Sequence, residues 1–91
     1  LATLLAPRPN PFSRETEVAF ALREPGEVTV RVVDVLGREV AALLDEALRP
    51  AGAQAVTWDG RSGGSRVASG TYAIVLEANG VRETQAVTVV R

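Results

Sequence analysis

The chain has 91 residues, 46% of them hydrophobic, and a formal net charge of -1 at pH 7. This length suits one small domain, and the composition is that of a globular protein rather than a disordered one. A net charge so close to zero lacks the excess of positive charge that is typical of nucleic-acid-binding proteins. No apolar run reaches the roughly 20 residues of a membrane-spanning helix. We therefore expect a globular domain without a nucleic-acid partner and without direct membrane insertion.

Three residue types with special chemistry are absent, namely Cys, His and Lys. Without Cys there is no disulfide, no thiolate nucleophile and no thiolate metal site. The lack of His removes the commonest general base and the commonest transition-metal ligand, and the lack of Lys removes Schiff-base chemistry. An enzyme built from this chain would depend on carboxylates alone. We expect no catalytic activity, no cofactor and no metal ion.

Residues 1–16 are expected to form a linker and an extended lead-in segment. Prolines alternate with other residues over positions 7–11, which fixes φ and biases the intervening residues towards extended backbone. Phe12 is the one large apolar side chain there, so we expect it to dock onto the edge of the following domain. That domain is expected to span residues 17–91.

Apolar side chains occupy every second position over residues 18–22 and again over residues 28–32. This is the period of half-buried strands, because successive side chains of a strand leave opposite faces. Between the two strands, Pro25-Gly26 is a favoured central pair of a type II turn.

A hairpin is predicted over residues 28–44, and its inner face is expected to seed the core. Asp34 can accept a hydrogen bond from the backbone two residues on, and Gly37 can take φ > 0 without steric cost. The apolar residues that follow this turn predict a strand to about Leu44, with a helix over residues 39–48 as the local alternative. Residues 45–52 are expected to form a loop.

Three further strands are predicted over residues 53–58, 71–78 and 81–90, with a turn-rich loop at 59–66 and a short extended piece at Val67-Ala68. Asn79-Gly80 is the strongest short hairpin signal available. Six or seven short strands without a helix predict an all-β fold, an immunoglobulin-like antiparallel β-sandwich. The expected core residues are Val18, Phe20, Leu22, Val28, Val30, Val32, Val40, Val56, Trp58, Tyr72, Ile74, Leu76, Val87 and Val89.

Few residues suggest chemistry. Asp59 could begin a calcium-binding loop, but it is the only carboxylate of residues 59–66, so a turn closed by the Asp side chain is the better interpretation. The carboxylate pairs Glu15/Glu17 and Asp45/Glu46 are expected at solvated positions rather than across a catalytic pocket.

Trp58 and Tyr72 could form an aromatic platform for a sugar. Each lies on an alternating strand face, however, and a β-sandwich needs large central side chains. We therefore expect both to pack in the core.

The ordered set of motifs is more specific than any one of them. In chain order the motifs are Asn10-Pro11-Phe12, Pro25-Gly26, the alternating valines of residues 28–32, Asp34-Val35-Leu36-Gly37-Arg38-Glu39-Val40, Ala51-Gly52, Val56-Thr57-Trp58-Asp59-Gly60, Ser69-Gly70-Thr71-Tyr72 and a valine-rich end at Arg91. This set resembles the C-terminal sorting domain of proteins exported by the type IX secretion system. It is also similar to the immunoglobulin-like domain of the flagellar hook-capping protein. The Asn-Pro-Phe motif and the short terminal strand favour the sorting domain.

The sorting-domain resemblance implies a non-catalytic module that directs a covalently linked N-terminal cargo protein through the type IX system. It implies secretion to the medium or the cell surface by way of the periplasm and outer membrane. The implied partners are the outer-membrane translocon and a sortase-like peptidase. The alternatives are an accessory module that binds carbohydrate or protein, or an immunoglobulin-like domain of the hook-cap type.

The terminal strand is the predicted partner-binding site, because an edge strand offers unpaired backbone groups for recognition by strand addition. Two of its side chains, Val87 and Val89, are expected to anchor the strand to the core. The predicted site residues are Val87, Thr88, Val89, Val90 and Arg91.

Overall fold

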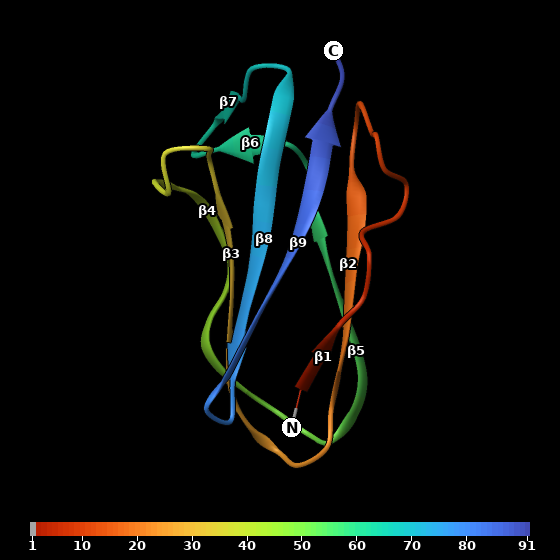
Figure 1. The fold of residues 1–91 in the computed structure, drawn as a ribbon, viewed down its shortest axis with the longest axis vertical. Helices are drawn as coiled ribbons and strands as arrows, with labels where there is room; N and C mark the ends of the chain where they lie inside the picture. Colours follow the sequence, from red (N-terminus) through yellow and green to blue (C-terminus); the bar gives the residue numbers. More distant parts are fainter. Residues whose placement is uncertain (1) are drawn as a thin grey trace.

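Two antiparallel sheets pack face to face in the computed structural model, which describes residues 2–91 (Figure 1). The smaller sheet has three strands in the order β1-β2-β5, and the larger has four in the order β4-β3-β8-β9. A third, two-stranded sheet joins β6 and β7. The strands are β1 Ala2–Leu4, β2 Thr16–Leu22, β3 Gly26–Val33, β4 Glu39–Arg49, β5 Gly52–Trp58, β6 Arg61–Ser62, β7 Ser65–Arg66, β8 Gly70–Ala78 and β9 Val81–Val89.

The predicted all-β, antiparallel sandwich is confirmed. All strand pairs within the sheets are antiparallel, and the molecule is elongated, with principal extents of 37 × 22 × 20 Å. Across residues 2–91 no helix has the length and apolar character needed to cross a membrane.

The core lies between the two sheets and follows the alternation seen in the sequence. Eleven of the fourteen predicted core residues are buried. The other three, Val40, Val56 and Tyr72, are partly buried and pack against that core. Ala2, Leu4 and Phe12 also belong to it. Phe12 is therefore docked on the sandwich, as predicted.

Part of the expected linker is a strand. Within residues 1–16, β1 pairs with β2 in the register Ala2↔Leu22 and Leu4↔Phe20. Three residues are too few for an alternation pattern to be recognised, and the strand is defined by the partner that its backbone meets. The proline-rich part of this segment is not extended as predicted, because residues 9–11 and 13–14 form bends.

The loop expected over residues 45–52 is wrong in its first part, because β4 continues to Arg49. The helix considered over residues 39–48 is not formed either. The first two residues of β3, Gly26 and Glu27, pair with Arg49 and Leu48, so the end of β4 completes the pairing of β3. A register shift between Val28 and Val30 absorbs the mismatch between the two strands. Pairing with β3 thus overrides the polar composition of the segment.

The type II turn at Pro25-Gly26 is also wrong. Gly26 begins β3 and is absent from the residues with positive φ, whereas a type II turn requires positive φ at its third residue. Glycine is needed here for space, since a Cβ on Gly26 would collide with the side chain of Asn79. That side chain donates from Nδ2 to the carbonyl oxygen of Glu24 at 3.2 Å.

The two predicted hairpin turns are confirmed. Gly37 has φ +82° between β3 and β4, and Gly80 has φ +77° between β8 and β9. Asn79 precedes Gly80 with φ +52°, and Ala78 pairs with Val81. Two central residues with positive φ define the type I′ hairpin that matches the twist of the flanking strands.

The turn-rich loop at 59–66 contains a short hairpin of β6 and β7. The extended piece expected at Val67-Ala68 is not a strand, although the N–H of Val67 donates to the carbonyl oxygen of Gly60 at 3.0 Å.

Replacing Trp58 tests the core. This side chain is 1% exposed, so Trp58→Ala should lower the free energy of unfolding by about 3–5 kcal/mol. Thr57→Ala, at an exposed position of the same strand, should cost less than about 1 kcal/mol. Urea denaturation monitored by circular dichroism measures both, and equal costs would show that Trp58 does not organise the core.

Replacing Gly80 tests the hairpin turn. Gly80→Ala meets no atom within 4 Å but places a side chain at φ +77°, which should cost about 1–2 kcal/mol of stability. Gly64→Ala also meets open space, without positive φ, and should leave the melting temperature unchanged or slightly raised. The melting temperatures of the two variants measure the effect of positive φ alone, because neither added Cβ meets another atom.

Candidate functional site

The five predicted partner-binding residues alternate between the core and the surface. Val87 and Val89 are 0% and 1% exposed and anchor β9, as expected. Thr88 is half-buried, Val90 is 50% exposed and Arg91 is exposed. The side chains available to a partner are therefore those of Thr88, Val90 and Arg91.

The outer edge of β9 is not free over these residues. A segment at positions 8–13, which we call the strap, lies along it and makes a parallel bridge between Phe12 and Val89. The N–H of Phe12 donates to the carbonyl oxygen of Thr88 at 3.0 Å, and the N–H of Val90 donates to the carbonyl oxygen of Phe12 at 2.8 Å. The unpaired edge predicted from the sequence is wrong here, because the chain fills it with its own backbone.

Asn10 extends this pairing with its side chain. Its Oδ1 accepts from the N–H of Thr88 at 2.9 Å, and its Nδ2 donates to the carbonyl oxygen of Ala86 at 3.3 Å. The amide thus imitates a strand residue opposite β9. Sequence analysis missed this role, since no periodicity marks a single Asn in a proline-rich segment.

The ring of Phe12 in the strap continues a row of aromatic side chains. Trp58 meets Phe12 edge-on with ring centroids 5.5 Å apart, and meets Tyr72 in the same way at 5.7 Å. The indole N–H of Trp58 donates to the carbonyl oxygen of Arg61 at 3.1 Å. The core interpretation of Trp58 is confirmed, and a sugar platform on its buried face is excluded.

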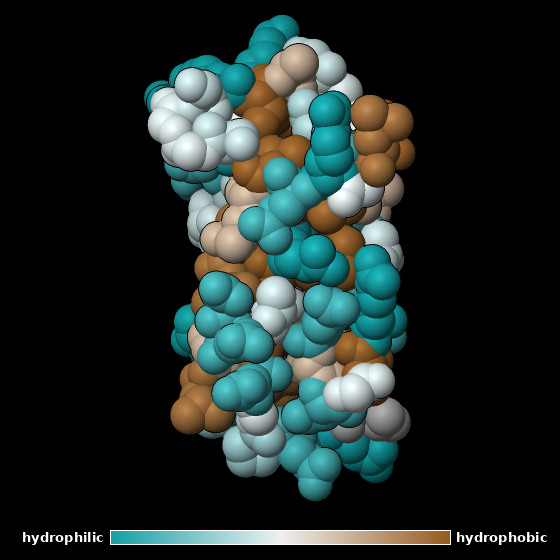
Figure 2. All heavy atoms as spheres, turned by 90° about the vertical axis from the view of Figure 1, so that its left-hand side faces the viewer, coloured by the Kyte–Doolittle hydropathy of each residue, from teal (hydrophilic) through white to brown (hydrophobic). Residues whose placement is uncertain are grey.

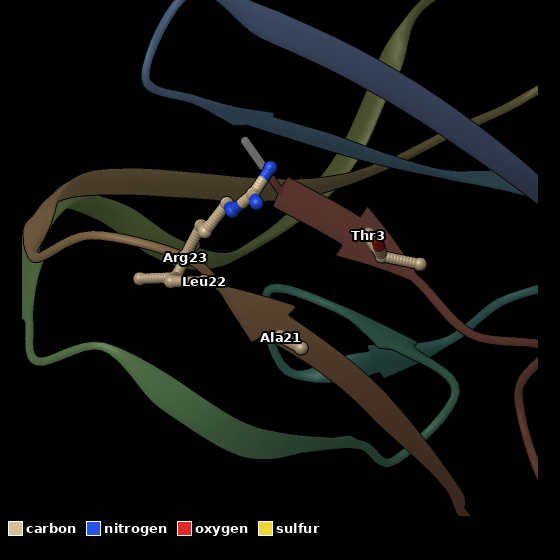
Figure 3. A pocket seen from close by; sticks show the side chains of 4 residues that line it. All are labelled: Thr3, Ala21, Leu22 and Arg23. Atoms are coloured by element: carbon tan, nitrogen blue, oxygen red, sulfur yellow. The ribbon is translucent and has the colours of Figure 1, made fainter.

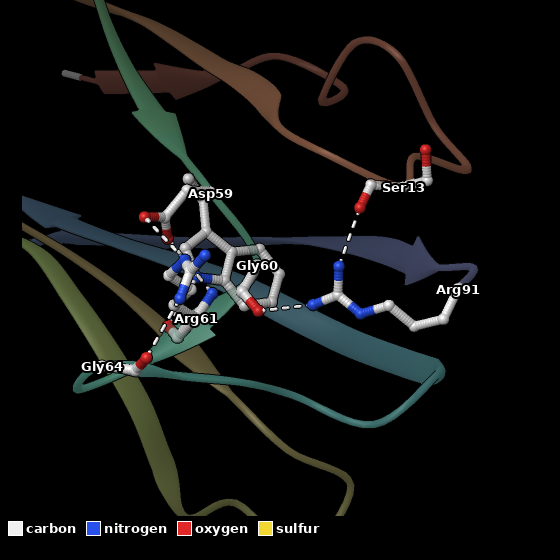
Figure 4. Close-up of polar contacts among 7 residues, drawn as sticks. Ser13, Asp59, Gly60, Arg61, Gly64 and Arg91 are labelled. Atoms are coloured by element: carbon white, nitrogen blue, oxygen red, sulfur yellow. Dashed lines mark hydrogen bonds and ion pairs between the residues drawn. The ribbon is translucent and has the colours of Figure 1, made fainter.

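Arg91 joins three separate segments at one end of the sandwich, and Figure 4 shows its bonds to two of them, at Ser13 and Gly60. Its guanidinium donates to the carbonyl oxygens of Ser13 at 2.8 Å, Gly60 at 2.7 Å and Val67 at 3.2 Å. Its backbone N–H donates to Oγ of Ser69 at 2.9 Å. The residue predicted to be read by a partner therefore holds the strap and two loops together.

The loop after Trp58 is a side-chain-closed turn, as predicted. Oδ1 of Asp59 accepts from the N–H of Arg61 at 3.1 Å, and the Arg61 guanidinium donates to the carbonyl oxygen of Gly64 at 3.0 Å (Figure 4). No cluster of three or more His, Cys, Asp or Glu suited to a metal ion occurs among residues 2–91.

The two carboxylate pairs do not come together as a catalytic dyad. Glu17 lies in β2 of the smaller sheet, whereas Asp45 and Glu46 lie in β4 of the larger one, and all three are exposed. A surface pocket of about 280 Å³ lies at the β1–β2 end, lined by Thr3, Ala21, Leu22 and Arg23 (Figure 3). It contains neither an acid nor an acid–base pair.

The turn between β3 and β4 is rigid and exposes apolar side chains. Oδ1 of Asp34 accepts from the N–H groups of Leu36 and Arg38, each at 2.9 Å. Its Oδ2 accepts from Nε of Arg38 at 3.0 Å. Val35 and Leu36 are nevertheless 82% and 72% exposed at its tip. Figure 2, which views the β4 side, shows hydrophobic atoms exposed near the upper end of a largely hydrophilic face.

An apolar pocket of about 140 Å³ adjoins this turn. Its lining residues come from the turn and from β8 and β9, and they are Asp34, Val35, Thr71, Tyr72, Ala73 and Ala86. An exposed pair of aliphatic side chains beside an apolar hollow is a typical protein-contact surface.

Comparison with protein families gives one match, and it covers most of the chain. The model of the FlgD Ig-like domain matches residues 10–81. The chain belongs to this family. Neither a curated protein nor a solved structure matches it.

The match confirms the immunoglobulin-like part of the resemblance seen in the sequence. It supports the hook-cap alternative better than the sorting domain, for which no comparison gives support. The sorting role therefore remains a prediction. Residues 82–91, which form most of β9 and the chain beyond it, lie outside the match.

The hydrogen bonds of the Asp34 carboxylate should make the stability of the fold depend on pH in the acid range. The pKa of Asp34 lies below its ordinary value of 3.8, first because the backbone N–H of Arg38 donates to it, and further because the Arg38 side chain and the Leu36 N–H do. A lowered folded-state pKa means that the carboxylate stabilises the fold above the ordinary pKa and that this stabilisation is lost as pH falls through the lowered one.

Asp34→Asn should therefore lower the melting temperature at pH 7 and have little effect at pH 2. Asp45→Asn, an exposed change of equal charge on β4, leaves the Arg38 contacts intact and serves as the control. Melting temperatures between pH 2 and pH 7 measure both variants. A difference between Asp34→Asn and the unmodified chain that persists unchanged at pH 2 would contradict the assignment.

Proposed function

We propose that this chain is a non-catalytic protein-binding module, the immunoglobulin-like domain of a hook-capping-type protein. The observation that carries the proposal is the family match over residues 10–81. The module works by contact with other protein subunits at the flagellar hook, outside the cell membrane.

The β3–β4 turn supports a contact role and is the proposed interface. Five hydrogen bonds, two of them between backbone groups, hold residues 34–38 in one conformation. The turn therefore loses little conformational entropy on binding, which is the advantage of a preorganised surface. Val35, Leu36 and the adjoining pocket supply the apolar centre that protein interfaces need.

Polar substitution of the turn tip tests this proposal. In cells lacking the parent protein, the parent carrying Val35→Ser with Leu36→Ser should support about tenfold fewer complete hooks, counted by electron microscopy. Leu48→Ser is the matched control, because Leu48 is 79% exposed at the other end of the β3–β4 hairpin.

Equal hook numbers for the double variant and the control would refute the turn as the interface. Normal hooks after removal of the whole domain from the parent protein would refute the hook role itself. Thermal melts of both variants verify that the sandwich stays folded.

The sorting function is a second proposal, supported by Thr88, Val90 and Arg91 pointing away from the core at the end of β9. In it, the outer-membrane translocon and a sortase-like peptidase act on this module, and the cargo reaches the medium or the cell surface. Residues 1–91 fused to a periplasm-targeted reporter should then direct its export in a type IX-competent host.

Single substitutions test this second proposal better than truncation, which would remove the core residues Val87 and Val89. Val90→Ser should reduce export of the fusion several-fold, because it alters an exposed side chain directly after β9, while Leu48→Ser should leave export unchanged. Retention of the unmodified fusion in the periplasm would contradict the sorting role.

A further inference from the structure

We propose that the outer edge of β9 is a peptide-binding groove for an extended segment with the pattern Asn-x-Phe. Residues 10–12 of the strap occupy it in this structure, and an Asn-x-Phe segment of a partner protein binds in their place. This proposal does not rest on the proposed function, because it concerns the backbone edge of β9 and not the apolar tip of the β3–β4 turn.

The backbone of the groove is arranged for strand addition. The edge of β9 away from β8 presents the carbonyl oxygens of Ala86 and Thr88 and the N–H groups of Thr88 and Val90. These backbone groups bond to the strap rather than to a strand. Main-chain hydrogen bonds of this kind supply affinity for any extended peptide. They use no side chain of β9, so a segment from another chain meets the same donors and acceptors.

Two subsites add selectivity. The first recognises Asn through the N–H of Thr88 and the carbonyl oxygen of Ala86. A side-chain amide matches this donor–acceptor pair, whereas a carboxylate or an aliphatic group leaves one partner unsatisfied.

The second subsite recognises the aromatic ring of Phe12, which is 4% exposed against Trp58. Gly60 makes room for it, because a Cβ there would lie 3.4 Å from the Phe12 ring and 3.0 Å from the Arg91 guanidinium. Arg91 closes the groove by donating to the carbonyl oxygen of Ser13 (Figure 4). The site thus combines an apolar cavity for the aromatic ring with a hydrogen bond from Arg91 to the backbone of the bound segment.

The strap can leave the groove without unfolding the sandwich. Its beginning is held separately on β2, where Arg8 and Glu17 exchange backbone hydrogen bonds at 3.1 and 2.8 Å. The hydroxyl of Thr16 also donates to the carbonyl oxygen of Pro9 at 2.8 Å. Arg14 and Glu15, which follow the strap, are exposed.

A synthetic peptide of residues 7–15 serves as the probe. The full chain carrying Asn10→Ala and Phe12→Ala has an intact groove with a weakened strap, and the labelled peptide should bind it, as measured by fluorescence anisotropy. A peptide with Ala in place of Phe should bind more than about tenfold more weakly. The unmodified chain and Leu5→Ala, a 51% exposed position outside the strap, should also bind the peptide, but more weakly than the double variant, because the peptide must first displace the strap.

Two further readouts locate the binding. Trp58 is the only Trp of the chain, so its emission should shift to the red in the double variant and return on addition of the peptide. The amide of Val90 should exchange faster in the variant and be protected again by the peptide. Asn10→Ala alone, at an exposed position, should show the same pattern more weakly and guards against loss of the fold.

A variant that is folded by circular dichroism but does not bind the peptide would overturn the proposal. Equal binding of the Ala-substituted peptide would overturn the aromatic subsite, and binding without renewed protection of Val90 would overturn its placement on β9.

Discussion

The three-stranded sheet is one strand narrower than the four-stranded sheet that it must cover, and this mismatch shapes the rest of the structure. β1 contributes only Ala2–Leu4, so its paired region ends well before the C-terminal half of β9. The apolar inner face of β9 at Val87 and Val89 would otherwise meet water. Phe12 and the strap supply the missing cover, and Arg91 fastens them to the loops at that end.

The sequence predicted those parts of the fold whose cause is local. The alternating valines of β3 and the Asn79-Gly80 turn depend on side-chain period and on φ, and both are visible in neighbouring residues. The extension of β4 to Arg49 was not predictable in this way, because its polar residues are ordered by β3 rather than by their own pattern. The role of Gly26 was equally hidden, since it depends on Asn79, a residue distant in sequence.

The candidate site shows the same division. Isolation of Phe12 among prolines predicted that it docks, and Asp34 was correctly assigned to a turn. The outer edge of β9 was expected to be open because only one strand, β8, lies next to this terminal strand in the sequence. In the fold it gains a second neighbour from the strap, whose residues lie more than seventy positions earlier. No local signal encodes such a long-range pairing.

The two proposed contact surfaces share Ala86. Its side chain lines the apolar pocket beside the β3–β4 turn, and its carbonyl oxygen accepts from Asn10 in the strap. The strap is held by a few hydrogen bonds, each worth about 1 kcal/mol net, and by one aromatic ring, whereas the strands bury the whole core. Opening of the strap alone leaves the paired strands and most of that core in place, so it costs less free energy than unfolding of the sandwich.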